Sequence, residues 1–180
     1  KDMTKWGADA QLDFSAEFAK AKASGAEAIY AFYPGKAGGA FIKQYQQAGL
    51  RGIVDLYTVF TVDSISLPKL QKANLGGVLG SKMTQQWSPD LDNAANKKFV
   101  ADFLEKHGRY PSFYAAQAYD SIMLIKSAVD AVDSNMDDKD AVRAALMKAD
   151  FESVRGDFKF GNNHMPIQNF YLREVVKDAK

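Results

Sequence analysis

The stretch AIYAFYPGKAGGAFIKQYQQAGL, residues 28–50, decides the fold class of this chain. It begins with a short apolar run that stops at Pro34-Gly35, and a loop of small residues follows. Apolar side chains then recur at helical spacing, at Phe41, Ile42, Tyr45 and Ala48, until Gly49 ends the pattern. A strand, a glycine-containing loop and a helix N-terminus in this order form half of a βαβ unit. Open α/β sheets bind their ligands at this edge of the sheet, so the stretch also indicates where function should be sought.

Two further apolar runs extend this pattern. Ile53–Phe60 predicts a second buried strand, and Val78–Met83 predicts a third. A short helix with Pro68 in its first turn is predicted between them. Because strands and helices alternate, the order favours a parallel sheet with right-handed crossovers. We therefore predict the α/β class, with a parallel sheet flanked by helices.

The pattern changes after the third predicted strand. A turn-rich connector, QQWSPDLD at 85–92, leads to predicted helices at 93–107, from Pro111 onward, and at 140–148. Near the end, Asp157–Phe160 alternates in polarity, a turn follows, and Asn169–Val176 reads as another strand. These two segments predict a C-terminal β-hairpin added to the helices.

The composition excludes several classes of function. Apolar residues make up 47% and charged residues 25% of the chain, which are ordinary values for a globular protein. A net charge of +1 gives no electrostatic reason to expect nucleic acid as a partner. No apolar run approaches the roughly 18 residues that a membrane span needs. The chain has no cysteine, which rules out thiol chemistry and disulfides. Lys1-Asp2-Met3 does not resemble a natural start, so we expect processing or truncation.

Catalytic motifs are weak in this sequence. His107 and His164 are far apart in sequence, and each is more typical of a helix end or a turn. The glycine-containing loop around Lys36 lacks the serine or threonine that follows the lysine of a phosphate-binding loop. The acidic residues within 133–140 lack the alternating ligands of a calcium loop. We therefore predict no catalytic residue, no metal and no cofactor.

Binding chemistry has more support. Tyr33, Tyr57, Thr58 and Phe60 fall at the C-terminal ends of predicted strands, and Trp87 and Tyr114 lie on the connector and the following helix. Aromatic side chains with a polar tip beside a helix N-terminus suit a small carboxylate with an apolar body. The alternative is that Phe60 and Trp87 pack in the core or beneath a lid.

Four stretches carry a family resemblance: LDFSAEFAKAKASGAEAIYAF from Leu12, PGKAGGAFIKQYQQAGL from Pro34, NKKFVADFLEKHGRYPSFYAAQAYDS from Asn96 and FESVRGDFKFGNNHMPIQNFYL from Phe151. In this order they resemble type I periplasmic solute-binding proteins of the branched-chain amino acid ABC-transport class. Such proteins have two α/β lobes that close around one solute and deliver it to a membrane permease. The resemblance implies a non-enzymatic periplasmic receptor whose signal peptide has been removed.

The resemblance covers only the second half of such a receptor. It implies that residues 1–80 and 136–180 belong to the second lobe. Residues 81–135 would cross the hinge and contribute helices to the first lobe. We expect the chain to be a fragment, because the first-lobe loops that hold the ligand's carboxylate are missing. The helices of 93–132 would then expose their inner faces, which favours pairing with a second copy of the chain.

Site residues carry over from the resemblance only in the second lobe. The loop from Tyr33 to Lys36, which includes Gly35, corresponds to the family's ligand-facing loop. Thr58 stands where amino-acid receptors have the acid that holds the ligand's ammonium group. Because a threonine cannot offset that charge, an aromatic or aliphatic carboxylate, or an amide, competes with a small amino acid as the solute.

Two other functions stay open from sequence. A regulatory domain of the same fold could sense an amide or an amino acid and signal to a partner protein. An α/β enzyme is the third alternative.

Overall fold

The computed structural model describes residues 2–157 and 159–177, which divide into two compact units. Unit 1 contains the residues up to Gln85 together with those from Leu172 onward, and unit 2 contains Gln86–Tyr171. Each unit is compact by itself. Among the described residues, no helix has the length and apolarity needed to cross a bilayer.

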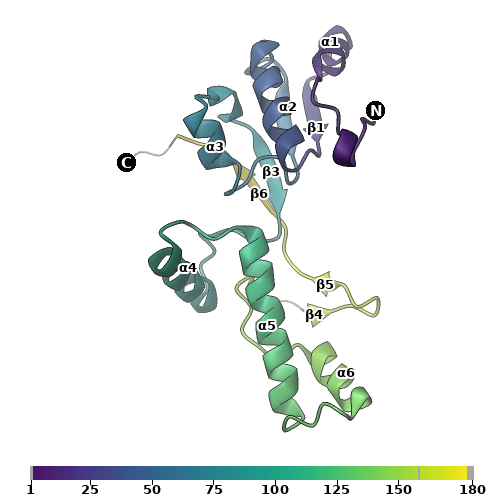
Figure 1. Ribbon diagram of the computed structural model, residues 1–180, viewed down its shortest axis with the longest axis vertical. Helices are drawn as coiled ribbons and strands as arrows, with labels where there is room; N and C mark the ends of the chain where they lie inside the picture. Colours follow the sequence, from purple (N-terminus) through teal and green to yellow (C-terminus); the bar gives the residue numbers. More distant parts are fainter. Residues whose placement is uncertain (1, 158, 178–180) are drawn as a thin grey trace. The chain divides into compact units, whose positions relative to one another are not determined.

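A four-stranded sheet in the order β1-β2-β3-β6 organises unit 1 (Figure 1). Its strands are β1 (Ala28–Ala31), β2 (Asp55–Thr58), β3 (Lys82–Gln85) and β6 (Tyr171–Glu174). β1 pairs in parallel with β2, and β2 pairs in parallel with β3. The predicted α/β class with a parallel sheet is confirmed.

Three α-helices connect these strands or precede them: α1 (Ser15–Ala23), α2 (Lys36–Gln47) and α3 (Leu67–Lys72). Two single turns of 3₁₀ helix lie at Gly7–Asp9 and Gly76–Val78. The apolar stripe that predicted α2 is buried, since Phe41, Ile42 and Tyr45 all lie in the core. The helix between β2 and β3 begins with Pro68 in its first turn, as the sequence predicted.

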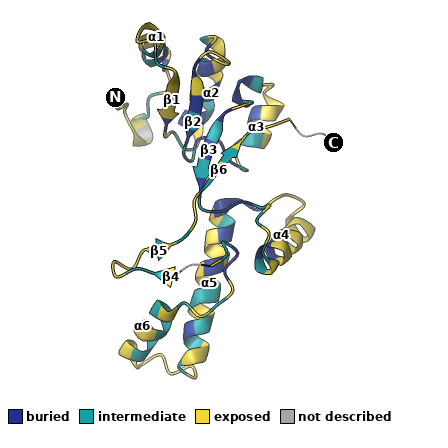
Figure 2. Ribbon diagram, turned by 180° about the vertical axis from the view of Figure 1, so that it is seen from behind, coloured by how far each residue is buried: buried dark blue, intermediate teal, exposed yellow. Residues whose placement is uncertain are grey.

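The core of unit 1 lies against one face of the sheet, here called the core face (Figure 2). Leu56, Thr58 and Met83 lie on this face and are buried, because alternate strand residues point the same way. Aromatic rings from α1 and α2 pack here, with centroids 4.8 Å apart for Phe18 and Phe41. On the opposite face Tyr30 is 71% exposed.

Unit 2 contains α4 (Ala94–His107), α5 (Phe113–Ala131) and α6 (Lys139–Lys148), followed by strands β4 (Lys159–Phe160) and β5 (Pro166–Ile167). Each helix starts after a capping side chain that accepts a backbone N–H in the first turn: Asn93, Ser112 and Asp138. Gly108 ends α4 in the left-handed conformation that glycine adopts without strain. The helices predicted at 93–107, from Pro111 and at 140–148 are confirmed.

The predicted hairpin is present, but its second strand was wrong. β4 pairs antiparallel with β5, whereas residues 171–174 form β6 in the sheet of unit 1. The amide of Val175 donates to the carbonyl of Ser81 at 3.0 Å, and the amide of Gly80 donates to the carbonyl of Val175 at 2.9 Å. An alternating pattern identifies a strand but not its partner, since every strand offers the same backbone groups.

The boundaries of the two units differ from those predicted for the lobes. From sequence, we predicted that residues 1–80 and 136–180 form the second lobe, and that residues 81–135 cross the hinge and contribute helices to the first lobe. The contacts place 136–171 with the helices α4 and α5, because α6 packs on α5 and contacts β4. Only the segment from Leu172 onward returns to the unit that contains the first 85 residues.

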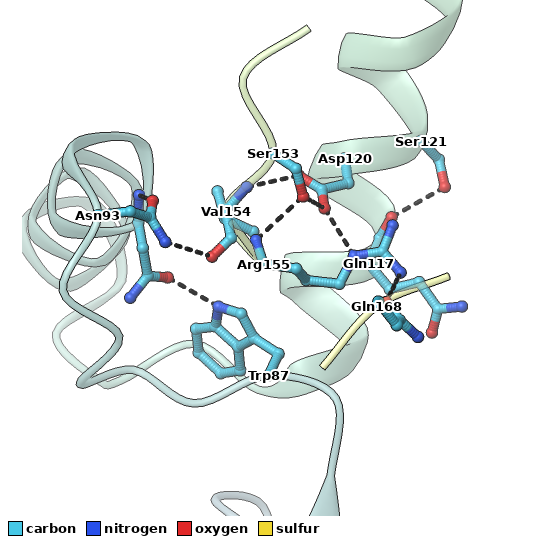
Figure 3. A network of polar contacts seen from close by, with 10 residues as sticks. Trp87, Asn93, Gln117, Asp120, Ser121, Ser153, Val154, Arg155 and Gln168 are labelled. Atoms are coloured by element: carbon cyan, nitrogen blue, oxygen red, sulfur yellow. Dashed lines mark hydrogen bonds and ion pairs between the residues drawn. The ribbon is translucent and has the colours of Figure 1, made fainter. Parts of the chain in front are cut away.

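A buried carboxylate holds α5 to the segment before the hairpin (Figure 3). Asp120, 1% exposed, accepts hydrogen bonds from the Ser153 hydroxyl at 2.6 Å and the Val154 amide at 3.0 Å. Arg155 donates through Nε to the same carboxylate at 2.8 Å and through Nη1 to Gln168 at 2.9 Å. This network compensates a charge that burial alone would penalise.

A second buried polar contact orders the connector before α4. Asn96 donates its amide to the carbonyls of Ser88, Pro89 and Leu91, at 3.1 to 3.3 Å. Its carbonyl oxygen accepts the indole N–H of Trp87 at 2.7 Å, which Figure 3 includes. The turn-rich connector predicted from sequence is thus held against α4 by the hydrogen bonds of Asn96.

Replacing Asp120 with alanine should lower the free energy of unfolding of unit 2 by about 3 kcal/mol, because Arg155 loses its charge partner in a buried position. Asp130→Ala on the same helix is the matched control, since its ion pair with Lys126 is exposed and should contribute less than about 0.5 kcal/mol. Urea unfolding followed by Trp87 fluorescence, in a Trp6→Phe background, measures both. Equal losses for the two substitutions would contradict the role given to Asp120.

Candidate functional site

The loop after β1 lies directly under the first turn of α2. A Cβ atom added to Gly38 would come within 2.1 Å of the carbonyl oxygen of Tyr33, so this position has no room for any side chain. The amide of Tyr33 donates to the Thr61 hydroxyl at 2.8 Å, which joins the loops that follow β1 and β2. These two loops form the carboxyl edge of the sheet, where α/β proteins bind ligands.

The Tyr33 side chain is held inside this edge. Its ring packs on Phe41 with centroids 5.0 Å apart and on Phe14 at 4.8 Å. Its hydroxyl accepts a hydrogen bond from Thr4 at 3.1 Å. Gly35 is the N-cap of α2 with φ near 70°, and Lys36 beside it is exposed. The N-cap has no side chain to accept from the helix amides, so the first turn of α2 is not capped by a side chain.

Tyr57 and Thr58 lie on opposite faces of β2. Tyr57 is half-buried on the face away from the core, with the Lys82 ammonium 5.1 Å from its ring centroid. Asp55, on the same face, accepts from Lys82 at 3.3 Å, and this hydrogen bond raises the pKa of Lys82. Thr58 lies on the core face, 1% exposed, and its hydroxyl has no hydrogen-bond partner.

An aromatic group lies beside the loop after β2. Phe60 has a positive φ of 54° and packs edge-on against Phe32, with centroids 5.9 Å apart. Phe32 in turn stacks on Trp6, also at 5.9 Å. Sequence analysis missed Phe32 and Trp6, although the position of Phe32 directly after the β1 run was a usable signal. Both are exposed aromatic side chains, the kind that contacts apolar ligands.

Gln85 was also missed. It is the last residue of β3 and is 4% exposed, and its side-chain nitrogen has no hydrogen-bond partner. The sequence signal was its place at the C-terminal end of a strand, the criterion that selected Tyr57 and Thr58.

Two predicted site residues belong to unit 2. Trp87 is 1% exposed, and its only polar atom donates to Asn96. Tyr114 is exposed near the start of α5, with its ring centroid 3.9 Å from that of Phe113. Both stay predictions as ligand contacts, as do the unit 1 residues. Within the part of the chain that the structure describes, no three acidic, histidine or cysteine side chains are arranged to hold a metal.

A family model described as periplasmic binding protein matches residues 6–180. The chain belongs to this family. The predicted resemblance is confirmed, and with it the similarity to ABC-transporter solute-binding proteins.

Individual relatives agree with this assignment. Over 171 residues the chain is 31% identical to a Leu/Ile/Val-binding protein homologue of Brucella abortus, which covers 92% of this chain and 43% of that protein. A solute-binding protein of an ABC transporter from R. palustris, solved with benzoate, is 32% identical with a TM-score of 0.81 and covers 94% of this chain and 45% of its own. Another solute-binding protein, from Rhodopseudomonas palustris and solved with p-hydroxybenzoic acid, is 31% identical with a TM-score of 0.80. This match covers 94% of the present chain and 46% of that protein. The chain therefore spans less than half the length of these relatives.

Two adjacent glycines test the packing that forms the carboxyl edge. Gly38→Ala should destabilise unit 1 by about 2 kcal/mol, because the new methyl group overlaps the carbonyl of Tyr33. Gly39→Ala, one residue further along α2, meets no atom within 4 Å and should stabilise the helix by up to about 1 kcal/mol. Thermal unfolding measures both changes. A neutral Gly38→Ala would show that the loop and α2 are not in close contact.

Proposed function

We propose that this chain is part of an extracytoplasmic receptor that binds a small solute for an ABC importer. The observation that carries the proposal is the match of residues 6–180 to periplasmic binding proteins, together with TM-scores near 0.8 to receptors solved with aromatic acids. The receptor would act by binding, without chemical turnover of its solute. Its partners would be the solute and a membrane permease, and it would work in the periplasm after removal of a signal peptide.

The lobe assignment is part of this proposal. Residues 1–80 would belong to the second lobe, and 81–135 would include the hinge crossover and helices of the first lobe. The contacts support this division for the first 85 residues and for the segment from Leu172 onward. They favour placing 136–171 with the helices of 86–135, in place of the second lobe predicted from sequence.

We propose an aromatic carboxylate as the solute. The aromatic group of Trp6, Phe32 and Phe60 supports an apolar solute body, and the N-terminus of α2, which no side chain caps at Gly35, supports a carboxylate. Thr58 at the end of β2 supports the absence of an ammonium group, because a hydroxyl cannot offset a positive charge. The competing class is the branched-chain amino acids, which the name of the Brucella relative suggests.

Thermal-shift measurements on the full-length protein should separate these two classes. Benzoate at ~100 times its dissociation constant should stabilise the protein by about 2.7 kcal/mol, since it binds only the folded state. Leucine and isoleucine should produce no comparable shift. The reverse pattern would replace the aromatic-acid proposal with an amino-acid receptor. Conversion of any bound compound would overturn the receptor proposal itself.

Pairing with a second copy is a further part of the proposal. Tyr114, Ile122 and Ile125 are at least half exposed and lie along one side of α5, one of the helices within 93–132 whose inner faces we expect to be exposed. Isolated soluble domains seldom expose such a row of apolar side chains. The 180-residue chain should therefore form a homodimer. Light scattering should give twice the mass of one chain, and Ile122→Lys with Ile125→Lys should give the monomer mass. A wild-type monomer would contradict this prediction.

A further inference from the structure

Two buried polar side chains at the carboxyl edge of the sheet lack hydrogen-bond partners. Within residues 2–157 and 159–177, three side chains have a buried oxygen or nitrogen atom without a partner: Glu17, Thr58 and Gln85. Glu17 lies on α1, and its other carboxylate oxygen accepts from Gln11 at 3.0 Å. Thr58 and Gln85 remain, and each is the last residue of its strand.

The sheet register places Thr58 and Gln85 on the same face. Thr58 of β2 lies opposite Met83 of β3, and Gln85 is two residues beyond Met83. Since alternate residues of a strand point the same way, all three side chains are on the core face. The hydroxyl of Thr58 and the amide nitrogen of Gln85 therefore come from neighbouring strands at one edge.

Burial without a partner makes both groups unfavourable for folding. A buried donor loses its hydrogen bonds to water, and valine or leucine would fill the same space without that cost. Nearly all buried polar atoms in folded proteins have partners, so two exceptions on adjacent strands require an explanation. A polar group of a bound solute at this edge would supply the missing hydrogen bonds.

The chemistry of the pair disfavours a cationic partner. A hydroxyl both donates and accepts, and the amide nitrogen donates, so together they fit a solute oxygen, either a hydroxyl or a carboxylate oxygen. In the proposed solute the carboxylate is assigned to the N-cap of α2, which leaves the hydroxyl for this pair. An ammonium group would require a carboxylate instead.

We propose that Thr58 and Gln85 bind a hydroxyl substituent on the ring of an aromatic carboxylate. This inference rests on the proposed function and names the solute more closely: a hydroxybenzoate in preference to unsubstituted benzoate. Thr58 and Gln85 are then specificity-determining residues of the second strand and third strand of the sheet.

Calorimetric titration of the full-length protein with 4-hydroxybenzoate and benzoate tests the inference. The wild type should bind 4-hydroxybenzoate about tenfold more tightly, the effect of one or two net hydrogen bonds. Thr58→Val and Gln85→Leu should each remove most of this preference while leaving the affinity for benzoate within about twofold. Thr58→Ser keeps the hydroxyl and should therefore retain the wild-type preference for 4-hydroxybenzoate.

Two controls separate recognition from a structural role. Thr84→Val changes the residue between Met83 and Gln85, on the opposite face of β3, and should leave both affinities unchanged. Urea unfolding without solute should show Thr58→Val and Gln85→Leu at least as stable as the wild type, because each replaces an unpartnered polar group with an apolar one.

The outcomes distinguish this inference from the proposed function. Equal binding of benzoate and 4-hydroxybenzoate by the wild type and both variants would overturn the hydroxyl contact and leave an aromatic-acid receptor. Binding of leucine with no binding of either aromatic acid would overturn both. If Thr58→Val and Gln85→Leu lower the stability and still bind 4-hydroxybenzoate in preference to benzoate, the two side chains have a structural role only and the inference is wrong.

Discussion

The close contact between α2 and the loop after β1 is the constraint on which the candidate site depends. Gly38 has no room for a side chain against the carbonyl of Tyr33, so the helix begins at one fixed distance from the sheet edge. The same loop is joined to the next by the hydrogen bond from Tyr33 to Thr61. Two loops and one helix N-terminus thus form a single framework, and the positions of Gly35 and Lys36 follow from it.

The two-residue period of β2 divides the predicted site between two faces. Tyr57 contacts Lys82 on one face, and Thr58 is buried on the other. A solute at the edge would therefore meet different chemistry on each side: a cation and an aromatic ring on one, and uncharged hydrogen-bonding groups on the other. Thr58 and Gln85 share the core face, whereas Tyr57, the sequence neighbour of Thr58, lies on the other face. A group that contacts Thr58 is therefore more easily reached by Gln85 than by Tyr57.

Both units combine packed aromatic rings with buried polar contacts. Packed aromatic rings connect α1 and α2 in unit 1. In unit 2, buried polar groups fix the path of the chain: Asp120 holds the segment around Val154, and Asn96 holds the connector that contains Trp87. Hydrogen bonds are directional, so these two side chains specify a geometry that apolar contacts would leave less defined. The buried indole of Trp87 follows from this arrangement, because its N–H needs a partner inside the unit.

The sequence by itself determined the α/β class, the family and most of the elements. Apolar periodicity and capping residues are local signals, and Asn93, Ser112 and Gly108 mark helix ends without reference to the rest of the chain. Only the tertiary structure decided that residues 171–174 pair in the sheet instead of in the hairpin, since strands compete for partners across the whole chain. It also decided that Gln85 is buried without a partner and that Trp87 has one. Hydrogen bonding of a buried side chain depends on segments distant in sequence, and no local pattern encodes it.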